Sequence, residues 1–215
     1  MSLTAARLTD RHRPASRGGG FTSLELMITM VIAVILIAVA VPQYTQFVQT
    51  QKAVSVINNL EDDLQYARSE AMKEGQFVSM CVSSSGTGCT TETWDCGWIT
   101  YSNPAFLTTP AFATGVSTLL RVGRGAVNSN CGGGSSAPSY TIATSPASTI
   151  VTYNRDGFAM GLLTSAPSGQ LFTLQSSPTE VTAATRCLWM DVLGRQYIQT
   201  AGQTAATGQT GNSCT

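Results

Sequence analysis

The sequence is poor in the residues on which most catalytic sites depend. Its 215 residues include a single histidine, His12, and only 11% of them are charged, against about 25% in an average soluble domain. Serine–histidine and cysteine–histidine nucleophile systems are therefore excluded from the rest of the chain. The sequence also contains no G-x-x-x-x-G-K-[ST] phosphate loop. We predict that the chain is not an enzyme and requires no cofactor.

The cysteines lack the spacing of a metal site. None forms a Cys-x-x-Cys pair, and all six follow the apolar segment described below; they are Cys81, Cys89, Cys96, Cys131, Cys187 and Cys214. Zinc sites usually combine closely spaced Cys and His ligands, so we predict no bound metal. Disulfide bonds formed in an oxidising compartment are the favoured interpretation, and scattered buried thiols are the alternative.

Basic charge is scarce beyond the N-terminus. Residues 1–20 contain four arginines and one aspartate, a net charge of +3, whereas residues 21–215 carry eight basic and eleven acidic side chains, a net charge of −3. With a net negative charge, residues 21–215 have no broad electrostatic attraction for nucleic acid. We therefore expect nucleic acid not to be a partner.

One long hydrophobic run, Phe21 to Val41, follows the basic region and contains a single charged residue, Glu25. About 20 apolar residues span a bilayer as a helix. Basic residues precede the run and none follows before Lys52, so the positive-inside rule places the N-terminus in the cytoplasm and the remainder outside. The alternative is a secretory signal peptide cut after Ala38-Val39-Ala40. The long region before the run, the length of the run and the internal carboxylate argue against that alternative.

Glu25 is the most informative residue of this segment. A carboxylate in a membrane helix costs about 2.5 kcal/mol or more and normally marks function. Cleavage between Gly20 and Phe21 would create an α-amino group four residues before Glu25. In a packed bundle, Glu25 could then neutralise the amine of a neighbouring subunit. A glutamate that merely snorkels to the headgroups is the alternative.

Gly20, followed by Phe21-Thr22-Ser23-Leu24-Glu25 and an unbroken apolar stretch, resembles the class III signal of type IV pilins and type II secretion pseudopilins. The resemblance implies that a prepilin peptidase cuts after Gly20 and N-methylates Phe21. Pro42 also fits this family, and physically it removes a helix hydrogen bond and kinks or loosens the helix. We expect a cleaved leader at 1–20 and a transmembrane and assembly helix at 21–42. The helix at 21–42 would anchor the protein in the inner membrane.

An amphipathic helix is predicted at 43–75. One apolar stripe recurs every three or four residues; its members are Ala53, Ile57, Leu60, Leu64, Ala67 and Ala71. Gly75 can end the helix as a C-cap. We interpret Glu61-Asp62-Asp63 as a solvated face or a subunit contact, because consecutive helix residues point in different directions and cannot act as paired catalytic carboxylates.

Residues 76–215 read as short strands separated by turns. Asp156-Gly157 and Leu193-Gly194 are typical of hairpin turns, and we expect loops at 102–115, 128–139 and 200–213. The Gly123-Arg124-Gly125 stretch lacks the context of a nucleotide site, so we expect a flexible loop there. The tryptophans are interpreted as core residues. The predicted strands are Phe77–Val82, Trp98–Tyr101, Thr118–Val122, Tyr140–Ala143, Thr149–Tyr153, Leu171–Gln175, Cys187–Val192 and Gln196–Gln199. The fold class is therefore α+β, with antiparallel sheet laid on the amphipathic helix.

Three segments resemble the GspH/FimT family of pilin-like proteins: residues 64–76, residues 152–157 and residues 191–195. The Trp94-Asp95-Cys96-Gly97-Trp98 segment resembles it too, although Cys96 is an additional cysteine in the family's W-x-x-G-W pattern. The resemblance implies a type IV pilin fold and a periplasmic β-rich domain at 76–215. It also implies assembly with other pilins or pseudopilins through the N-terminal helix, in an extracellular pilus or a periplasmic pseudopilus.

Three functions fit this resemblance. The first is a minor pilin that primes or tips a type IV pilus, and the second is a GspH-type pseudopilin of a type II secretion system. The third is a FimT-like minor pilin that captures DNA. The family's DNA-binding motif has the form G-R-x-R, whereas this chain has Gly194-Arg195-Gln196-Tyr197 and no basic residue beyond Arg195. We therefore rank DNA capture last.

Loop composition favours one set of disulfides among the 15 that six cysteines allow. A Ser-, Gly- and Thr-rich loop between Cys81 and Cys89 has little else to order it, which favours a bond between these two residues. A bond from Cys187 to Cys214 would hold a tail without an apolar pattern. Cys96 and Cys131 then remain as the third pair.

Overall fold

The computed structural model describes residues 20–103, 112–124, 131, 140–160, 169–176, 184–203 and 214. The expected leader and most of the three expected loops lie outside these residues. The chain divides into two compact units between Pro42 and Gln43.

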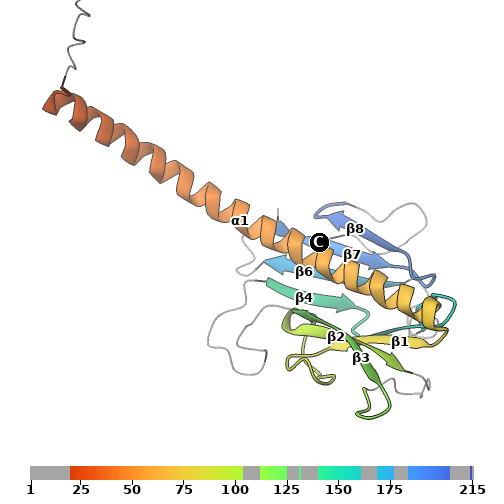
Figure 1. Cartoon of the computed structure of the whole chain (residues 1–215). Coiled ribbons are helices and arrows are strands. Elements are labelled where there is room, and N and C mark those ends of the chain that lie inside the picture. Colours follow the sequence, from red (N-terminus) through yellow and green to blue (C-terminus); the bar gives the residue numbers. More distant parts are fainter. Residues whose placement is uncertain are drawn as a thin grey trace, which may run out of the picture. The chain divides into compact units, whose positions relative to one another are not determined.

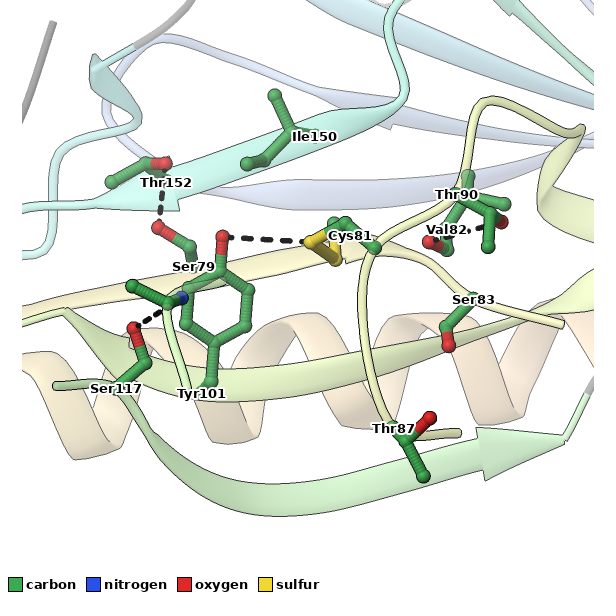
Figure 2. The surroundings of a disulfide bond; sticks show 12 residues. Ser79, Cys81, Val82, Ser83, Thr87, Thr90, Tyr101, Ser117, Ile150 and Thr152 are labelled. Atoms are coloured by element: carbon green, nitrogen blue, oxygen red, sulfur yellow. Dashed lines mark hydrogen bonds between the residues drawn. A yellow bond between two sulfur atoms is a disulfide. The ribbon is translucent and has the colours of Figure 1, made fainter. Parts of the chain in front are cut away.

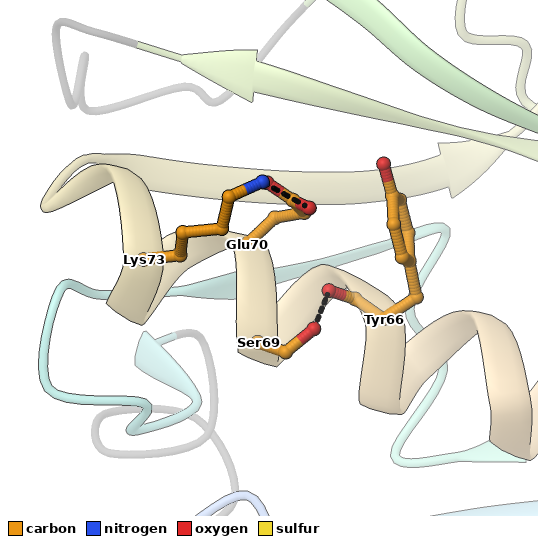
Figure 3. Close-up of polar contacts among 4 residues, drawn as sticks. All are labelled: Tyr66, Ser69, Glu70 and Lys73. Carbon is orange, nitrogen blue, oxygen red and sulfur yellow. Dashed lines mark hydrogen bonds and ion pairs between the residues drawn. The ribbon is translucent and has the colours of Figure 1, made fainter.

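One α-helix, α1 (Ser23–Glu74), contributes to both units (Figure 1). It begins at Ser23 because Thr22 acts as its N-cap, with the backbone N–H of Glu25 donating to Thr22 Oγ1 at 3.2 Å. It ends at Glu74, and Gly75 follows with the positive φ of 64° expected of a C-cap glycine. Lys73 Nζ lies 3.1 Å from Glu70 Oε1 in the last turn (Figure 3). A lysine at this position also interacts favourably with the helix dipole.

The part of α1 in the first unit is apolar on every side. All side chains from Phe21 to Val41 are exposed. The most apolar 18-residue window of α1 has a mean hydropathy of 2.8, so by length and composition the helix could cross a membrane. Pro42 lies inside the helix, which continues through it.

The part of α1 in the second unit buries one stripe. All six residues of the predicted stripe are 2% exposed or less; they are Ala53, Ile57, Leu60, Leu64, Ala67 and Ala71. Burying a leucine or isoleucine side chain contributes about 1.5–3 kcal/mol. The amphipathic helix predicted from the sequence is therefore confirmed. Its apolar stripe is the face that packs into the core.

Two four-stranded antiparallel sheets lie against this part of α1 (Figure 1). All eight predicted strands are confirmed, with ends within two residues of those expected. One sheet has the order β3-β2-β1-β5 and consists of β1 (Phe77–Val82), β2 (Gly97–Asn103), β3 (Thr118–Arg124) and β5 (Ile150–Tyr153). The other has the order β4-β6-β7-β8 and consists of β4 (Tyr140–Ser145), β6 (Gln170–Ser176), β7 (Arg186–Met190) and β8 (Gln196–Thr200).

The main core lies between the buried stripe of α1 and the inner faces of both sheets. Each sheet also carries a small cluster away from this core. Cys81, Ile99 and Tyr101 form the cluster on the first sheet. On the second sheet the cluster consists of Leu171, Cys187, Trp189 and Cys214. The α+β fold predicted from the sequence is confirmed.

The tryptophans belong to these cores, as predicted. Trp94, in the short 3₁₀ helix η1 (Trp94–Cys96), is 2% exposed, and Trp98 and Trp189 are each 1% exposed. The Trp94 ring meets Phe172 edge-on, with ring centroids 5.3 Å apart. Such a pair adds about 0.5–1.5 kcal/mol beyond the area that it buries.

Candidate functional site

The junction between Gly20 and Phe21 is open to its surroundings. A Cβ added to Gly20 would meet no heavy atom within 4 Å, and the Phe21 side chain is 80% exposed. The junction lies just before the N-cap residue, Thr22. Nothing among the described residues would keep a processing enzyme from this peptide bond.

Glu25 occupies the third helical position of α1, in its first turn. A carboxylate there is stabilised by the partial positive charge of the helix N-terminus. Thr22 and Glu25 together form the sequence pattern T-x-x-E, which is a capping-box signature. The sequence prediction assigned no role to Thr22, although this pattern could have revealed it. Thr22 determines where the helix begins. The position of the Glu25 carboxylate relative to the Gly20–Phe21 bond follows from that helix start.

Among the described residues, nothing covers the apolar part of α1. Its large side chains remain 52–67% exposed from Leu24 to Val41. Contiguous exposed apolar patches of more than a few hundred Å² are rare on soluble monomers and mark protein or membrane contacts. This segment therefore has the surface of an element that is covered by lipid or by other helices.

Asp63 does not lie on a solvated face, and that part of the prediction for the acidic run is wrong. Asp63 is only 3% exposed. Trp98 Nε1 donates to Asp63 Oδ2 at 2.6 Å, and Arg121 Nε lies 2.8 Å from Oδ1. The Arg121 guanidinium also stands 5.4 Å from the centroid of the Tyr66 ring. Asp63 is buried because β2 and β3 bring it these two partners, so its role is to join α1 to the first sheet.

Asp63 is the only member of the acidic run that behaves this way. Asp62 is exposed and Glu61 is half-buried. The three carboxylates therefore do not share one environment.

Gly123 and Arg124 end strand β3, so the flexible loop expected there is also wrong for these two residues. A Cβ on Gly123 would clash with the Trp98 indole ring. Gly123 is thus required to let Trp98 reach Asp63. Gly125 lies outside the described residues.

The six cysteines form three disulfide bonds, in the pairs predicted from the sequence: Cys81–Cys89, Cys96–Cys131 and Cys187–Cys214. Figure 2 shows Cys81 on β1 beside Tyr101 of β2. Burial raises the pKa of Tyr101 to about 12. Two of the bonds lie in the small clusters of the sheets and so reinforce the parts that α1 does not cover.

One group of residues has the composition of a metal site. Ligand atoms of Asp95, Cys96 and Cys131 lie within 4.8 Å of one another. The two sulfurs are joined to each other, whereas metal binding needs free thiolates. This group therefore gives no reason to revise the prediction of no metal.

Arg195, the first arginine of the partial G-R-x-R motif, is already paired. Its Nε lies 2.7 Å from Asp191 Oδ2, and its backbone N–H donates to Asp191 Oδ1 at 2.8 Å. The hydrogen bond that Arg195 donates to the Asp191 carboxylate raises the pKa of Arg195. Asp191 opens the β7–β8 turn through these bonds, which is why β7 ends at Met190 and not at the predicted Val192.

Comparisons with known proteins agree with this fold. Residues 56–193 match the family described as type II transport protein GspH. The structure resembles a crystal structure of the type IV minor pilin FimU of Pseudomonas aeruginosa, with a TM-score of 0.50 and 20% identity over 71% of this chain and 92% of that chain. A second crystal form of FimU gives a TM-score of 0.47 and 19% identity over 67% and 90% of the two chains. A search of curated proteins found no match.

Proposed function

Because the chain belongs to the GspH family of type II transport proteins, we propose that it is a structural subunit that enters a filament through the apolar part of α1. The observation that carries the proposal is the change in burial along one helix. Side chains up to Phe47 are exposed, whereas Ala53 begins a stripe that is fully packed. The second unit buries this stripe in its own core, whereas the apolar side chains of the first part of α1 stay exposed and would find their partners in the membrane and in other subunits.

The proposed maturation begins at the open junction. A prepilin peptidase cuts between Gly20 and Phe21 and N-methylates Phe21, which removes the leader 1–20. Before assembly, residues 21–42 cross the inner membrane with the N-terminus in the cytoplasm, and residues 43–75 and 76–215 form the periplasmic part. The exposed junction and the basic residues before it support this order.

Glu25 is the proposed assembly contact. Cleavage leaves a positive amine at Phe21, and Thr22 holds the first turn so that the Glu25 carboxylate stands within the same end of the helix. An unpaired carboxylate inside a bilayer is costly, so a neighbouring subunit's amine lowers the free energy of one particular axial register. Pairing of this kind makes assembly selective without any contribution to the fold of the second unit.

The finer proposal is a minor pilin in the priming or tip complex of a type IV pilus. The second candidate is a pseudopilin of a type II secretion system, which the description of the family favours. A deletion strain separates them. Loss of surface pili and twitching with normal protein export supports the minor pilin, whereas retention of exported enzymes inside the cell supports the pseudopilin.

No catalytic, cofactor or DNA-binding role is proposed. The residues from 21 onward contain no histidine and carry a net charge of −3. Arg195, the residue nearest to a DNA-binding motif, is paired with Asp191. Duplex DNA should therefore show no salt-dependent binding to the chain.

The substitution Glu25→Val tests the proposal, with Glu74→Val at the other end of the same helix as the matched control. We expect the Glu25→Val chain to enter the membrane and form its three disulfides, yet to be missing from sheared filaments. Glu74→Val should be incorporated as in the wild type. Normal incorporation of Glu25→Val would remove the proposed assembly contact.

A further inference from the structure

A surface pocket of about 360 Å³ lies between the end of α1 and the turn that joins β7 to β8. Its polar lining includes the side chains of Arg68, Ser69, Arg195 and Gln196. Both contributing elements belong to the second unit. The pocket is therefore part of one compact body.

The guanidinium of Arg68 is held in place by two turns. Its Nε donates to the carbonyl oxygen of Gly157 at 3.1 Å. Gly157 and Gly194 have positive φ values of 81° and 74°, and a Cβ on either would lie only 3.0 or 3.1 Å from Arg68 Nε. The two turns thus approach Arg68 closely because both carry glycine where they pass it. This geometry fixes the guanidinium through Nε and, as far as the described residues go, leaves its two terminal NH₂ groups to bind a further acceptor.

Arg195 is fixed in the same manner on the opposite side of the pocket. Asp191 accepts a hydrogen bond from its Nε at 2.7 Å. The Arg195 side chain is still 57% exposed. It therefore also retains terminal NH₂ groups for a further acceptor.

The charges around the pocket do not balance. Asp191 offsets the charge of Arg195. Among the described residues, no ion pair includes Arg68. The ion pairs there join Lys73 to Glu70, Arg121 to Asp63 and Arg195 to Asp191. The pocket keeps one positive charge without a carboxylate. In the part of the chain that the structure describes, the pocket thus offers a cation that lacks an anionic partner.

Exposed apolar side chains accompany this charge. Met72 lines the pocket and is 47% exposed. Leu193 and Phe158, the chain neighbours of the two glycines that approach Arg68, are 41% and 37% exposed. A Cβ on Gly157 would lie 2.9 Å from the Met72 sulfur, so Met72 covers the turn that holds Arg68. Arginine and methionine with aromatic neighbours are enriched at protein interfaces. Nucleic acid would not gain from this apolar rim, and the net charge of the body opposes it.

We propose that this pocket binds a carboxylate side chain flanked by apolar residues on another subunit of the filament. The proposal rests on the proposed function. A carboxylate can accept paired hydrogen bonds from a guanidinium, and such bonds are stronger and more directional than neutral ones. The pocket would select the neighbour of the second unit, whereas Glu25 acts on the membrane part.

The test uses the full chain in detergent micelles, labelled so that the arginine Nε–Hε signals are observed by NMR. The probe is the capped pentapeptide Ala-Leu-Glu-Leu-Ala, compared with its Gln counterpart, inorganic phosphate and a short DNA duplex. We expect the Glu peptide alone to shift the Arg68 signal. Arg195→Gln should weaken its binding at least tenfold. Arg155→Gln, an exposed arginine on the neighbouring turn and outside the pocket lining, should leave it unchanged.

Arg68→Lys serves as a second variant, because it keeps the charge but loses the fork of donors; it should also weaken binding. Circular dichroism and the three disulfides check that each variant is folded. The proposal is overturned if the Glu peptide causes no shift, if phosphate or DNA acts equally well, or if Arg155→Gln has the same effect as Arg195→Gln. Absence of the wild-type chain from filaments would instead overturn the proposed function, since the titration does not depend on assembly.

Discussion

The two parts of α1 have the same secondary structure and opposite surroundings. From Ser23 to Pro42 the helix is apolar on every side and exposed, whereas from Gln43 to Glu74 it is amphipathic and its apolar stripe is buried. A helix that is apolar all round belongs in a membrane or inside an assembly, and a one-sided helix belongs on a domain. The contrast separates folding from assembly along one continuous element. Substitutions in the two parts should therefore have separable effects.

A matched pair of leucine substitutions should show the largest difference between the two parts of α1. Leu64 is fully buried and Leu36 is 65% exposed. Leu64→Ala should lower the free energy of unfolding of the second unit by about 2–5 kcal/mol, because it leaves a cavity beneath the sheets. Leu36→Ala should leave that quantity within about 0.5 kcal/mol. Denaturant unfolding in micelles, followed by tryptophan fluorescence, measures both, and equal losses would contradict the separation.

The disulfides lie in the second unit alone, and their effects should follow loop length. Cys187–Cys214 spans 27 residues and Cys81–Cys89 spans 8. In the chain-entropy picture, replacing the first pair with serine should cost about 3.5 kcal/mol and the second about 2.5 kcal/mol.

Non-reducing peptide mapping of the wild-type chain is the companion measurement for the disulfides. A peptide that joins Cys187 to a cysteine other than Cys214 would refute the pairing. Membrane insertion of both serine variants should remain normal, because the apolar part of α1 contains no cysteine.

A smaller effect distinguishes two neighbouring carboxylates in the second part. Asp63→Ala removes the acceptor of Trp98 and the partner of Arg121, so it should cost about 1–3 kcal/mol. Asp62→Ala changes an exposed side chain and should stay within about 0.5 kcal/mol. Thermal unfolding of the two variants compares them directly. Equal stabilities would show that the contact between α1 and the first sheet does not depend on Asp63.

The last effect is a loss of stability that is confined to alkaline pH. Burial raises the pKa of Tyr101 and of Tyr140 to about 12, against about 10 in an unfolded chain. The unfolded state therefore loses these protons first, so the stabilising contribution is complete below pH about 10 and declines as pH rises toward about 12. Unfolding midpoints measured across this range should fall, while a flat profile would mean that these hydroxyls ionise in the folded state as they do in water.

Much of the fold could be predicted because local patterns and tertiary structure agree. The stripe from Ala53 to Ala71 and the alternation of strands and turns are local signals, and the structure confirms them. Asp63 could not be placed because its burial depends on Trp98 and Arg121, which are distant in the sequence. The same holds for Gly123, whose missing side chain is explained only by the indole ring beside it.

The candidate sites also differ in whether a short stretch of sequence reveals them. The junction at Gly20 and the carboxylate of Glu25 are visible in a short stretch of sequence, and so is the cap at Thr22 once the T-x-x-E pattern is noticed. The pocket around Arg68 is not visible there, because α1 and the distant β7–β8 turn build it and a third segment, the turn at Gly157, holds Arg68. Two turns that carry glycine approach Arg68 and fix its guanidinium, which takes part in no ion pair among the described residues.

The most direct test of the account is the intact mass of the chain extracted from membranes and from sheared filaments. If the apolar part of α1 is retained for assembly, both samples should begin at Phe21, with the mass of one added methyl group. A chain that begins at Val41 would contradict the account, because cleavage after Ala40 would discard nearly the whole apolar part of the helix together with Glu25.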